Sequence, residues 1–113
     1  MSEFLYLYRG GERPGTPEKM QQQMQRWGTW LKELTEKGHV KDPGQPLDPS
    51  GKVVKGNGKT VTDGPYAEAK DIVGGFTLVE AKDLDHAVEL SRTCPIFVVG
   101  GLVEVRPIMK INL

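Results

Sequence analysis

The chain of 113 residues has the size of one domain, and its 15 basic residues balance 15 acidic ones, so the formal net charge is zero. That balance argues against binding to nucleic acid, which needs a surplus of cations on one face, and against binding to an anionic membrane surface. The single cysteine, Cys94, excludes an intrachain disulfide, and neither a secretory leader nor an apolar stretch of ~18 residues is apparent, so we expect a cytoplasmic protein.

The first third of the chain predicts a strand followed by a helix. Residues 4–9 alternate as a strand that carries apolar or aromatic groups on both faces. A helix is expected from Pro17 to Lys37, because Thr16 suits the N-cap position and Gly38 suits the turn that ends a helix. Its apolar residues recur at steps of three and four and form one stripe: Met20, Met24, Trp27, Leu31 and Leu34, with Trp30 on the edge.

The remainder of the chain predicts four more strands and one more helix. Residues 39–51 are rich in Pro, Gly and Asp and are interpreted as a long connection. Gly56-Asn57-Gly58 is typical of a hairpin turn. The expected elements are, in order, strands at 52–55, 59–62 and 74–81, a helix capped by Asp83 and ended by Pro95, and a strand at 102–108.

This order of elements predicts a single α+β domain over residues 1–113 that associates with a second copy. Two helices cover only one face of such a sheet, so apolar side chains are expected to remain on the other face. The residues that imply this patch are Phe4, Tyr6, Tyr8, Phe76 and Leu78. An exposed apolar patch normally marks an interface, and two sheets packed face to face would form a homodimer.

One loop carries a family resemblance. Asp63-Gly64-Pro65-Tyr66-Ala67-Glu68, followed by Lys70 and then by Gly74-Gly75-Phe76, resembles the signature of the DGPF group within the YCII-related family, with Tyr66 where Phe is usual. Three later segments agree with it: Asp83-Leu84-Asp85, Cys94-Pro95 and residues 103–107. The resemblance covers nearly the whole chain and implies a ferredoxin-like sandwich that dimerises into an α/β barrel.

The resemblance implies more than one kind of function. It implies enzymes with a His–Asp pair for some members, removal of chloride from a chlorinated aromatic compound for one relative, and association with extracytoplasmic-function sigma factors for others. The histidine of that pair belongs toward the first helix, and residues 17–37 contain no histidine, so the His–Asp mechanism does not carry over. His39 and His86 have no acidic or cysteine partner at ligand spacing, so neither a metal site nor a cofactor is expected.

The loop also suggests chemistry by its own residues. Asp63, Glu68 and Lys70 place two carboxylates and an ammonium group within eight residues, as a general acid–base site requires. Asp63 is the candidate base, Lys70 the group that holds an anion, and Glu68 the group that orients it. The same residues suit a ligand-binding loop, or a structural turn in which Asp63 accepts backbone hydrogen bonds and Glu68 pairs with Lys70.

Four further residues are candidates for binding a ligand. Tyr66 and Trp30 suit the lining of an apolar pocket for a flat molecule, whereas Trp27, in mid-stripe, is assigned to the core. Arg106 and Arg9 anchor an anion if their face of the sheet turns inward, with Glu104 as the partner of Arg106, and form ordinary surface pairs if that face meets water.

Three hypotheses follow for the function. The first is a cytoplasmic protein that binds a small molecule near the Asp63–Glu68 loop and performs acid–base chemistry on it. The second is a non-catalytic regulatory module linked to sigma-factor-type transcription control, and the third is a dimerisation domain without a cavity. A cavity that reaches these residues favours the first two over the third.

Overall fold

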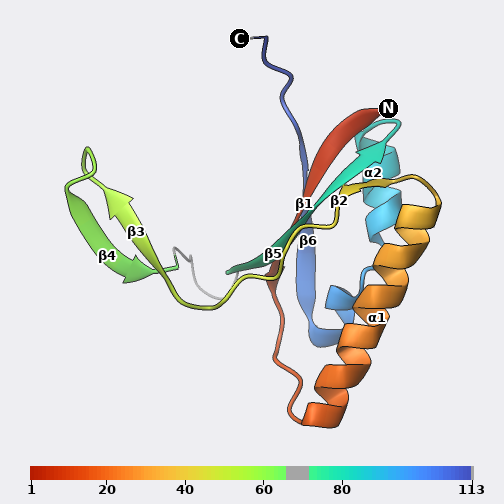
Figure 1. The fold of residues 1–113 in the computed structure, drawn as a ribbon, viewed down its shortest axis with the longest axis horizontal. Helices are drawn as coiled ribbons and strands as arrows, with labels where there is room; N and C mark the ends of the chain where they lie inside the picture. Colours follow the sequence, from red (N-terminus) through yellow and green to blue (C-terminus); the bar gives the residue numbers. More distant parts are fainter. Residues whose placement is uncertain (66–71, 113) are drawn as a thin grey trace.

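The computed structural model describes residues 1–65 and 72–112 of the chain. The helices and strands follow one another in an α+β order (Figure 1): β1 Ser2–Gly10, α1 Pro17–Glu36, β2 Val40–Asp42, β3 Gly51–Lys55, β4 Thr60–Gly64, β5 Val73–Ala81, α2 Leu84–Ser91, the 3-10 helix η1 Pro95–Val99 and β6 Gly101–Pro107. None of the helices in this described part is long and apolar enough to cross a bilayer.

Four strands form one antiparallel sheet in the order β2-β5-β1-β6, and β3 pairs with β4 in a separate hairpin. Both helices lie on the same side of the four-stranded sheet, while the hairpin projects away on the other side (Figure 1). The expected mixed α+β class is therefore confirmed. The central strand β1 pairs with β5 and β6, which come from the far end of the sequence.

Local signals placed the helix starts and the hairpin correctly. The Thr16 side chain accepts a hydrogen bond from the backbone N–H of Lys19, and Asp83 accepts one from the N–H of His86. Three successive residues, Gly56 to Gly58, have positive φ, as a tight hairpin turn requires. Two elements were not expected: β2 lies inside the presumed connection 39–51, and η1 begins at Pro95.

The face of the sheet that meets the helices carries the aromatic residues of β1. Phe4, Tyr6 and Tyr8 are all buried there, so their assignment to the helix-free face was wrong. The two tyrosines can be buried because their hydroxyls have partners: Tyr6 donates to the backbone carbonyl of Ala87 in α2, and Tyr8 donates to Thr77 of β5. Tyrosine thus packs its ring in the core and gives its polar end a partner there.

The buried stripe of α1 also differs in phase from the expected one. Its buried residues are Gln23, Trp30 and Leu34, whereas Met20 and Met24 are 41% and 67% exposed. Gln23 is tolerated in the core because its amide nitrogen donates to the backbone carbonyl of Pro95, 2.7 Å away. The buried face of α1 thus includes a polar residue whose partner is distant in the sequence and could not be found from the periodicity of the helix.

The opposite, helix-free face of the sheet is called the open face, and it has an apolar centre and charged ends. Leu5 lies opposite Leu78, and Leu7 lies opposite Phe76, in adjacent strands. All four side chains are half-buried. At one end Lys41 pairs with Glu3 at 2.7 Å, and at the other Arg9 pairs with Glu104 at 2.8 Å.

Candidate functional site

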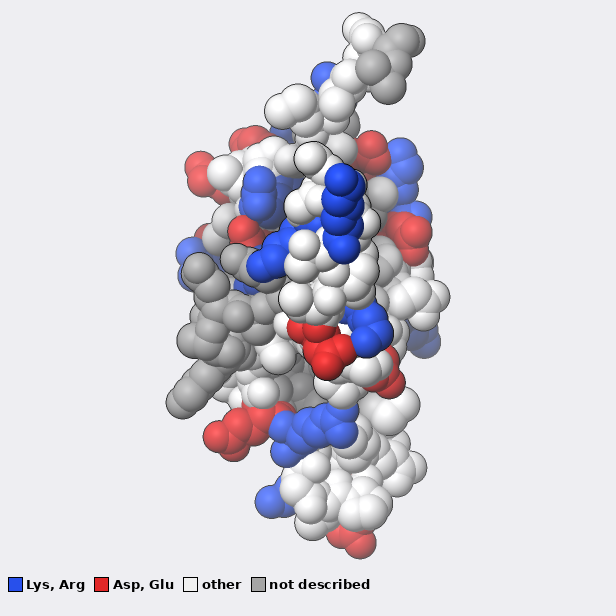
Figure 2. All heavy atoms as spheres, turned by 90° about the vertical axis from the view of Figure 1, so that its left-hand side faces the viewer, with Lys and Arg blue, Asp and Glu red and all other residues white. Residues whose placement is uncertain are grey.

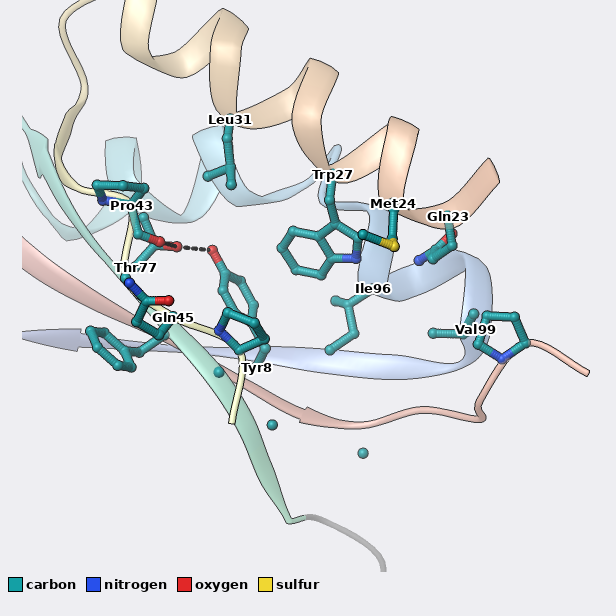
Figure 3. A pocket seen from close by; sticks show the side chains of 17 residues that line it. Tyr8, Gln23, Met24, Trp27, Leu31, Pro43, Gln45, Thr77, Ile96 and Val99 are labelled. Carbon is teal, nitrogen blue, oxygen red and sulfur yellow. Dashed lines mark hydrogen bonds between the residues drawn. The ribbon is translucent and has the colours of Figure 1, made fainter. Parts of the chain in front are cut away.

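A cavity of about 460 Å³ lies between α1 and the sheet. Trp27, Met24 and Leu31 point into it from α1, and Tyr8 points into it from β1 (Figure 3). Its outer wall is the segment Pro43–Pro46, and η1 closes the remaining side with Ile96 and Val99. No lining residue in the described part of the chain is charged. A volume of this size suits a small organic molecule.

Two aromatic rings of the cavity wall pack edge to face. The ring centroids of Tyr8 and Trp27 lie 4.7 Å apart with an interplanar angle of 76°, which is an edge-to-face contact. Trp30 lies behind Trp27, also edge-on, with its centroid 5.8 Å away. The packed indole and phenol rings therefore restrict one another's orientation, and Trp27 presents a rigid surface to the cavity.

The polar groups at the centre of the cavity form a short chain of hydrogen bonds. The Tyr8 hydroxyl lies 2.7 Å from Thr77 Oγ1, which lies 2.9 Å from the backbone carbonyl of Pro43 (Figure 3). Burial raises the pKa of Tyr8 well above its ordinary value, so the phenol stays protonated at any physiological pH. This chain links β1, β5 and the outer wall.

Gly44 and Gly75 bring the outer wall onto the sheet edge. Pro46 forms a bridge with Gly75, and the N–H of Leu47 donates to the carbonyl of Gly74 at 2.8 Å. A Cβ atom on Gly75 would lie only 3.1 Å from the Gln45 carbonyl oxygen and 3.6 Å from the Tyr8 ring. The absence of side chains at these positions lets segment 43–46 approach the sheet and close the cavity.

The two arginines proposed as anion anchors lie on the open face, on the other side of the sheet from the cavity. Glu104 accepts a hydrogen bond from Arg9 at 2.8 Å and a longer one from Arg106 at 3.5 Å. The hydrogen bond from Arg9, with the positive charge it carries, lowers the pKa of the Glu104 carboxyl. The structure thus brings Arg9 and Arg106 together around one carboxylate and keeps both away from the cavity.

Asp63, the candidate base, lies on β4 in the projecting hairpin. Its carboxylate is 91% exposed and pairs with Lys52 across the hairpin at 2.7 Å. The other residues assigned to this loop site, Tyr66, Glu68 and Lys70, lie outside the described residues. The prediction that these residues act together therefore stays a prediction.

Asp63→Asn is expected to change the free energy of unfolding by less than about 1 kcal/mol, because an exposed ion pair contributes little. Urea denaturation of the two proteins measures the difference. Lys52→Gln removes the same ion pair from the other side and should give a similarly small change. A loss well above 1 kcal/mol in Asp63→Asn alone would show that this carboxylate has a structural partner beyond Lys52.

The two tryptophans have the opposite roles from those that the sequence suggested. Trp30 is 5% exposed and donates its indole N–H to Thr93 at 3.1 Å, so it belongs to the core, while Trp27 lines the cavity. Sequence reasoning also missed Tyr8, Thr77 and Gln23 as lining residues. The signal that could have found Tyr8 and Thr77 is their place on one face of two neighbouring strands.

The two histidines lie close together at the end of the sheet that carries Glu80. Their ring centroids are 5.1 Å apart, with Nδ1 of His39 near the carbonyl of Glu80 and Nδ1 of His86 accepting from the N–H of Lys82. Within residues 1–65 and 72–112, no group of three or more His, Cys, Asp or Glu side chains is placed to hold a metal ion.

The charges on the hairpin side of the molecule are mixed. Basic and acidic side chains alternate over this side in the space-filling view (Figure 2). The hairpin contributes the Lys52–Asp63 pair, and the open face contributes the pairs of Arg9 and Arg106 with Glu104. Neighbouring charges of opposite sign offset one another, so the described residues on this side do not form the continuous basic surface that a polyanion requires.

The chain has counterparts among known proteins. The sequence model of the YCII-related domain matches residues 4–112. No curated protein matches the chain. Among solved structures it is similar to 5-chloro-2-hydroxyhydroquinone dehydrochlorinase from Burkholderia phenoliruptrix AC1100, in complex with 2,5-dihydroxybenzoquinone, at 22% identity and a TM-score of 0.42 over 88% of this chain and 90% of that one.

Proposed function

The chain belongs to the YCII-related family, and from this premise we propose that it binds a small, flat, largely apolar molecule in the cavity between α1 and the sheet. The observation that carries the proposal is the cavity itself, about 460 Å³ in volume and uncharged in its described lining. Apolar surface with a few fixed polar groups is the usual composition of a ligand site.

The lining favours a flat ligand. Trp27 and Tyr8 are held at 76° to each other, so a planar molecule can lie against the face of one ring and the edge of the other. Met24 and Leu31, on the same helix, add flexible apolar contacts. Met24 is 67% exposed, so a bound molecule would cover apolar surface of the protein and also bury its own apolar surface.

Acid–base chemistry on the bound molecule is a finer proposal. The Asp63–Lys70 loop leads into Ile72, whose carbonyl accepts from the N–H of Gly10 at 3.1 Å. Gly10 lines the cavity, and so do Gly74 and Gly75, which follow Ile72 after Val73. Incubation of a bound compound with the protein, followed by mass detection of product, tests this step. Turnover that persists unchanged in Asp63→Asn would argue against Asp63 as the base.

We further propose that the chain works as a homodimer through the open face. The sheet order β2-β5-β1-β6 with two helices on one side supports a ferredoxin-like sandwich. Two cross-strand pairs, Leu5 with Leu78 and Leu7 with Phe76, form the apolar centre that a second copy would cover. Two open faces packed against each other about a two-fold axis would form an α/β barrel.

Ligand binding is expected to raise the melting temperature by ~10 °C at a concentration 100-fold above the Kd, since binding to the folded state alone adds about 2.7 kcal/mol. A thermal-shift screen of neutral aromatic metabolites measures this. The two tryptophans then locate the ligand. In Trp30→Phe, the remaining Trp27 should shift its emission when the compound binds, because its environment loses water.

Trp27→Phe is the matched control, because the remaining Trp30 is already buried and should show little change in emission. Calorimetry with the same compound verifies that each variant still binds. An emission shift in Trp27→Phe and none in Trp30→Phe would place the ligand elsewhere and contradict the proposed site. A screen in which no compound moves the melting temperature would contradict binding of this ligand class.

A further inference from the structure

The positions of the protons in the Tyr8–Thr77–Pro43 chain follow from the acceptor at its end. The Pro43 carbonyl can only accept, so Thr77 Oγ1, at 2.9 Å, must donate its proton to it. A hydroxyl has one proton, so Thr77 has none left for Tyr8. The Tyr8 hydroxyl, at 2.7 Å, must therefore donate to Thr77.

This order leaves the Tyr8 oxygen as an acceptor. Its proton is committed to Thr77, so only its lone pairs remain for a molecule in the cavity. Thr77 is 1% exposed and Tyr8 6%, so water does not compete readily for either hydrogen bond. The raised pKa of Tyr8 keeps the proton in place rather than releasing a phenolate.

The other polar side chains of the lining do not reverse this preference. The Gln23 amide oxygen accepts from Arg26 at 3.3 Å, and its nitrogen donates to the Pro95 carbonyl at 2.7 Å. Gln23 also lies toward η1, away from the Tyr8 hydroxyl (Figure 3). Gln45 is exposed on the outer wall. A ligand group buried beside Tyr8 therefore meets an acceptor surrounded by apolar side chains.

We infer that the cavity selects neutral aromatic molecules that carry one N–H or O–H donor. The Tyr8 oxygen accepts the hydrogen bond from that donor. The inference rests on the proposed binding function and specifies its ligand class. A carboxylate would be buried without a cation among the described lining residues, and a ligand with acceptors alone would face the lone pairs of Tyr8. Both classes are disfavoured beside the Tyr8 hydroxyl, which donates to neither. The indole N–H of Trp27, a donor in the lining, lies on the side of its ring toward Ile96, away from that hydroxyl (Figure 3).

The test compares two probes of nearly equal shape, indole and benzofuran, which differ in having a ring N–H or a ring oxygen. Calorimetry or ligand-observed NMR on the full chain should give indole a dissociation constant about fivefold lower, the ratio expected for one net hydrogen bond of about 1 kcal/mol. In Tyr8→Phe the acceptor oxygen is lost, so indole and benzofuran should have about equal dissociation constants. Benzofuran should still bind.

Thr77→Val gives an independent and sharper readout. Without the Thr77 oxygen the Tyr8 proton loses its acceptor and turns to the cavity, so benzofuran should gain affinity relative to indole. Thr77→Ser keeps the hydroxyl and should keep the wild-type preference. Near-ultraviolet circular dichroism of each variant confirms that the aromatic core is intact.

The outcomes separate the two proposals. Equal binding of both probes by the wild type, or an unchanged preference in Thr77→Val, would overturn the selectivity and leave the binding function standing. Failure of both probes to bind at millimolar concentration would overturn the selectivity together with the proposed site. A preference for indole that persists in Tyr8→Phe would show that a group other than Tyr8 accepts the hydrogen bond from the indole N–H.

Discussion

Gly44→Ala is expected to lower the free energy of unfolding by about 3 kcal/mol or more. Gly44 has φ +75°, a conformation that costs an alanine about 1–2 kcal/mol. A Cβ atom there would lie 1.7 Å from the carbonyl oxygen of Phe76 and 2.6 Å from its carbonyl carbon, so backbone must move. Relief of such an overlap adds a further cost of about 1–3 kcal/mol. Urea denaturation measures the sum.

Gly28→Ala is the matched control, because it makes the same chemical change in the middle of α1, where nothing lies within 4 Å of the added atom. Alanine is the better helix former, so this variant should gain about 0.5–1 kcal/mol. Gly44→Ala should also weaken ligand binding, since it displaces the outer wall of the cavity. A Gly44→Ala protein as stable as the wild type would contradict the packing of segment 43–46 on β5.

Leu7→Lys is expected to convert a dimeric protein into a folded monomer. Leu7 lies at the centre of the open face, between Phe76 of β5 and Glu104 of β6. In a dimer the new ammonium group would be buried without a partner on the facing copy, which is strongly unfavourable. In the monomer it lies in water beside the Glu104 carboxylate, so the fold is retained. Sedimentation velocity at several concentrations measures the change.

Leu84→Lys serves as the control, because Leu84 is 43% exposed on α2, on the helix side of the sheet. It makes the same substitution away from the open face and should leave the dimer intact. Two results would contradict the proposed interface: a wild-type protein that sediments as a monomer at all concentrations, or a Leu7→Lys protein that stays dimeric. A wild-type protein that is always monomeric would mean that no second copy covers the open face.

The elements that were predicted from the sequence are those specified by neighbouring residues. The start of α1 depends on Thr16 and Pro17, which act within one helical turn. The hairpin depends on the short turn at Gly56–Gly58. Such signals need no knowledge of the rest of the fold, so the helices, the hairpin and the mixed α+β class could be read from the chain.

The cavity could not be predicted, because distant residues build it. Gln23 is on the buried face of α1, where its amide donates to the Pro95 carbonyl, 72 residues away. The outer wall belongs to a segment interpreted as a connection, and it is placed by pairing with Gly75. The motif at Asp63 indicates a site because it combines carboxylates with an ammonium group, yet the Asp63 side chain lies exposed on a hairpin strand.

The central place of β1 has a consequence for how the protein is made. Phe4 pairs with Val79 on one side and with Pro107 on the other, so both neighbours of the first strand are synthesised long after it. While the ribosome completes the chain, β1 has neither edge paired, and its three buried aromatic residues have no core to enter. The sheet therefore closes only when β6 leaves the exit tunnel. Until then both edges of β1 are open to pairing with the strands of other molecules, which is the hazard that chaperones limit in growing chains.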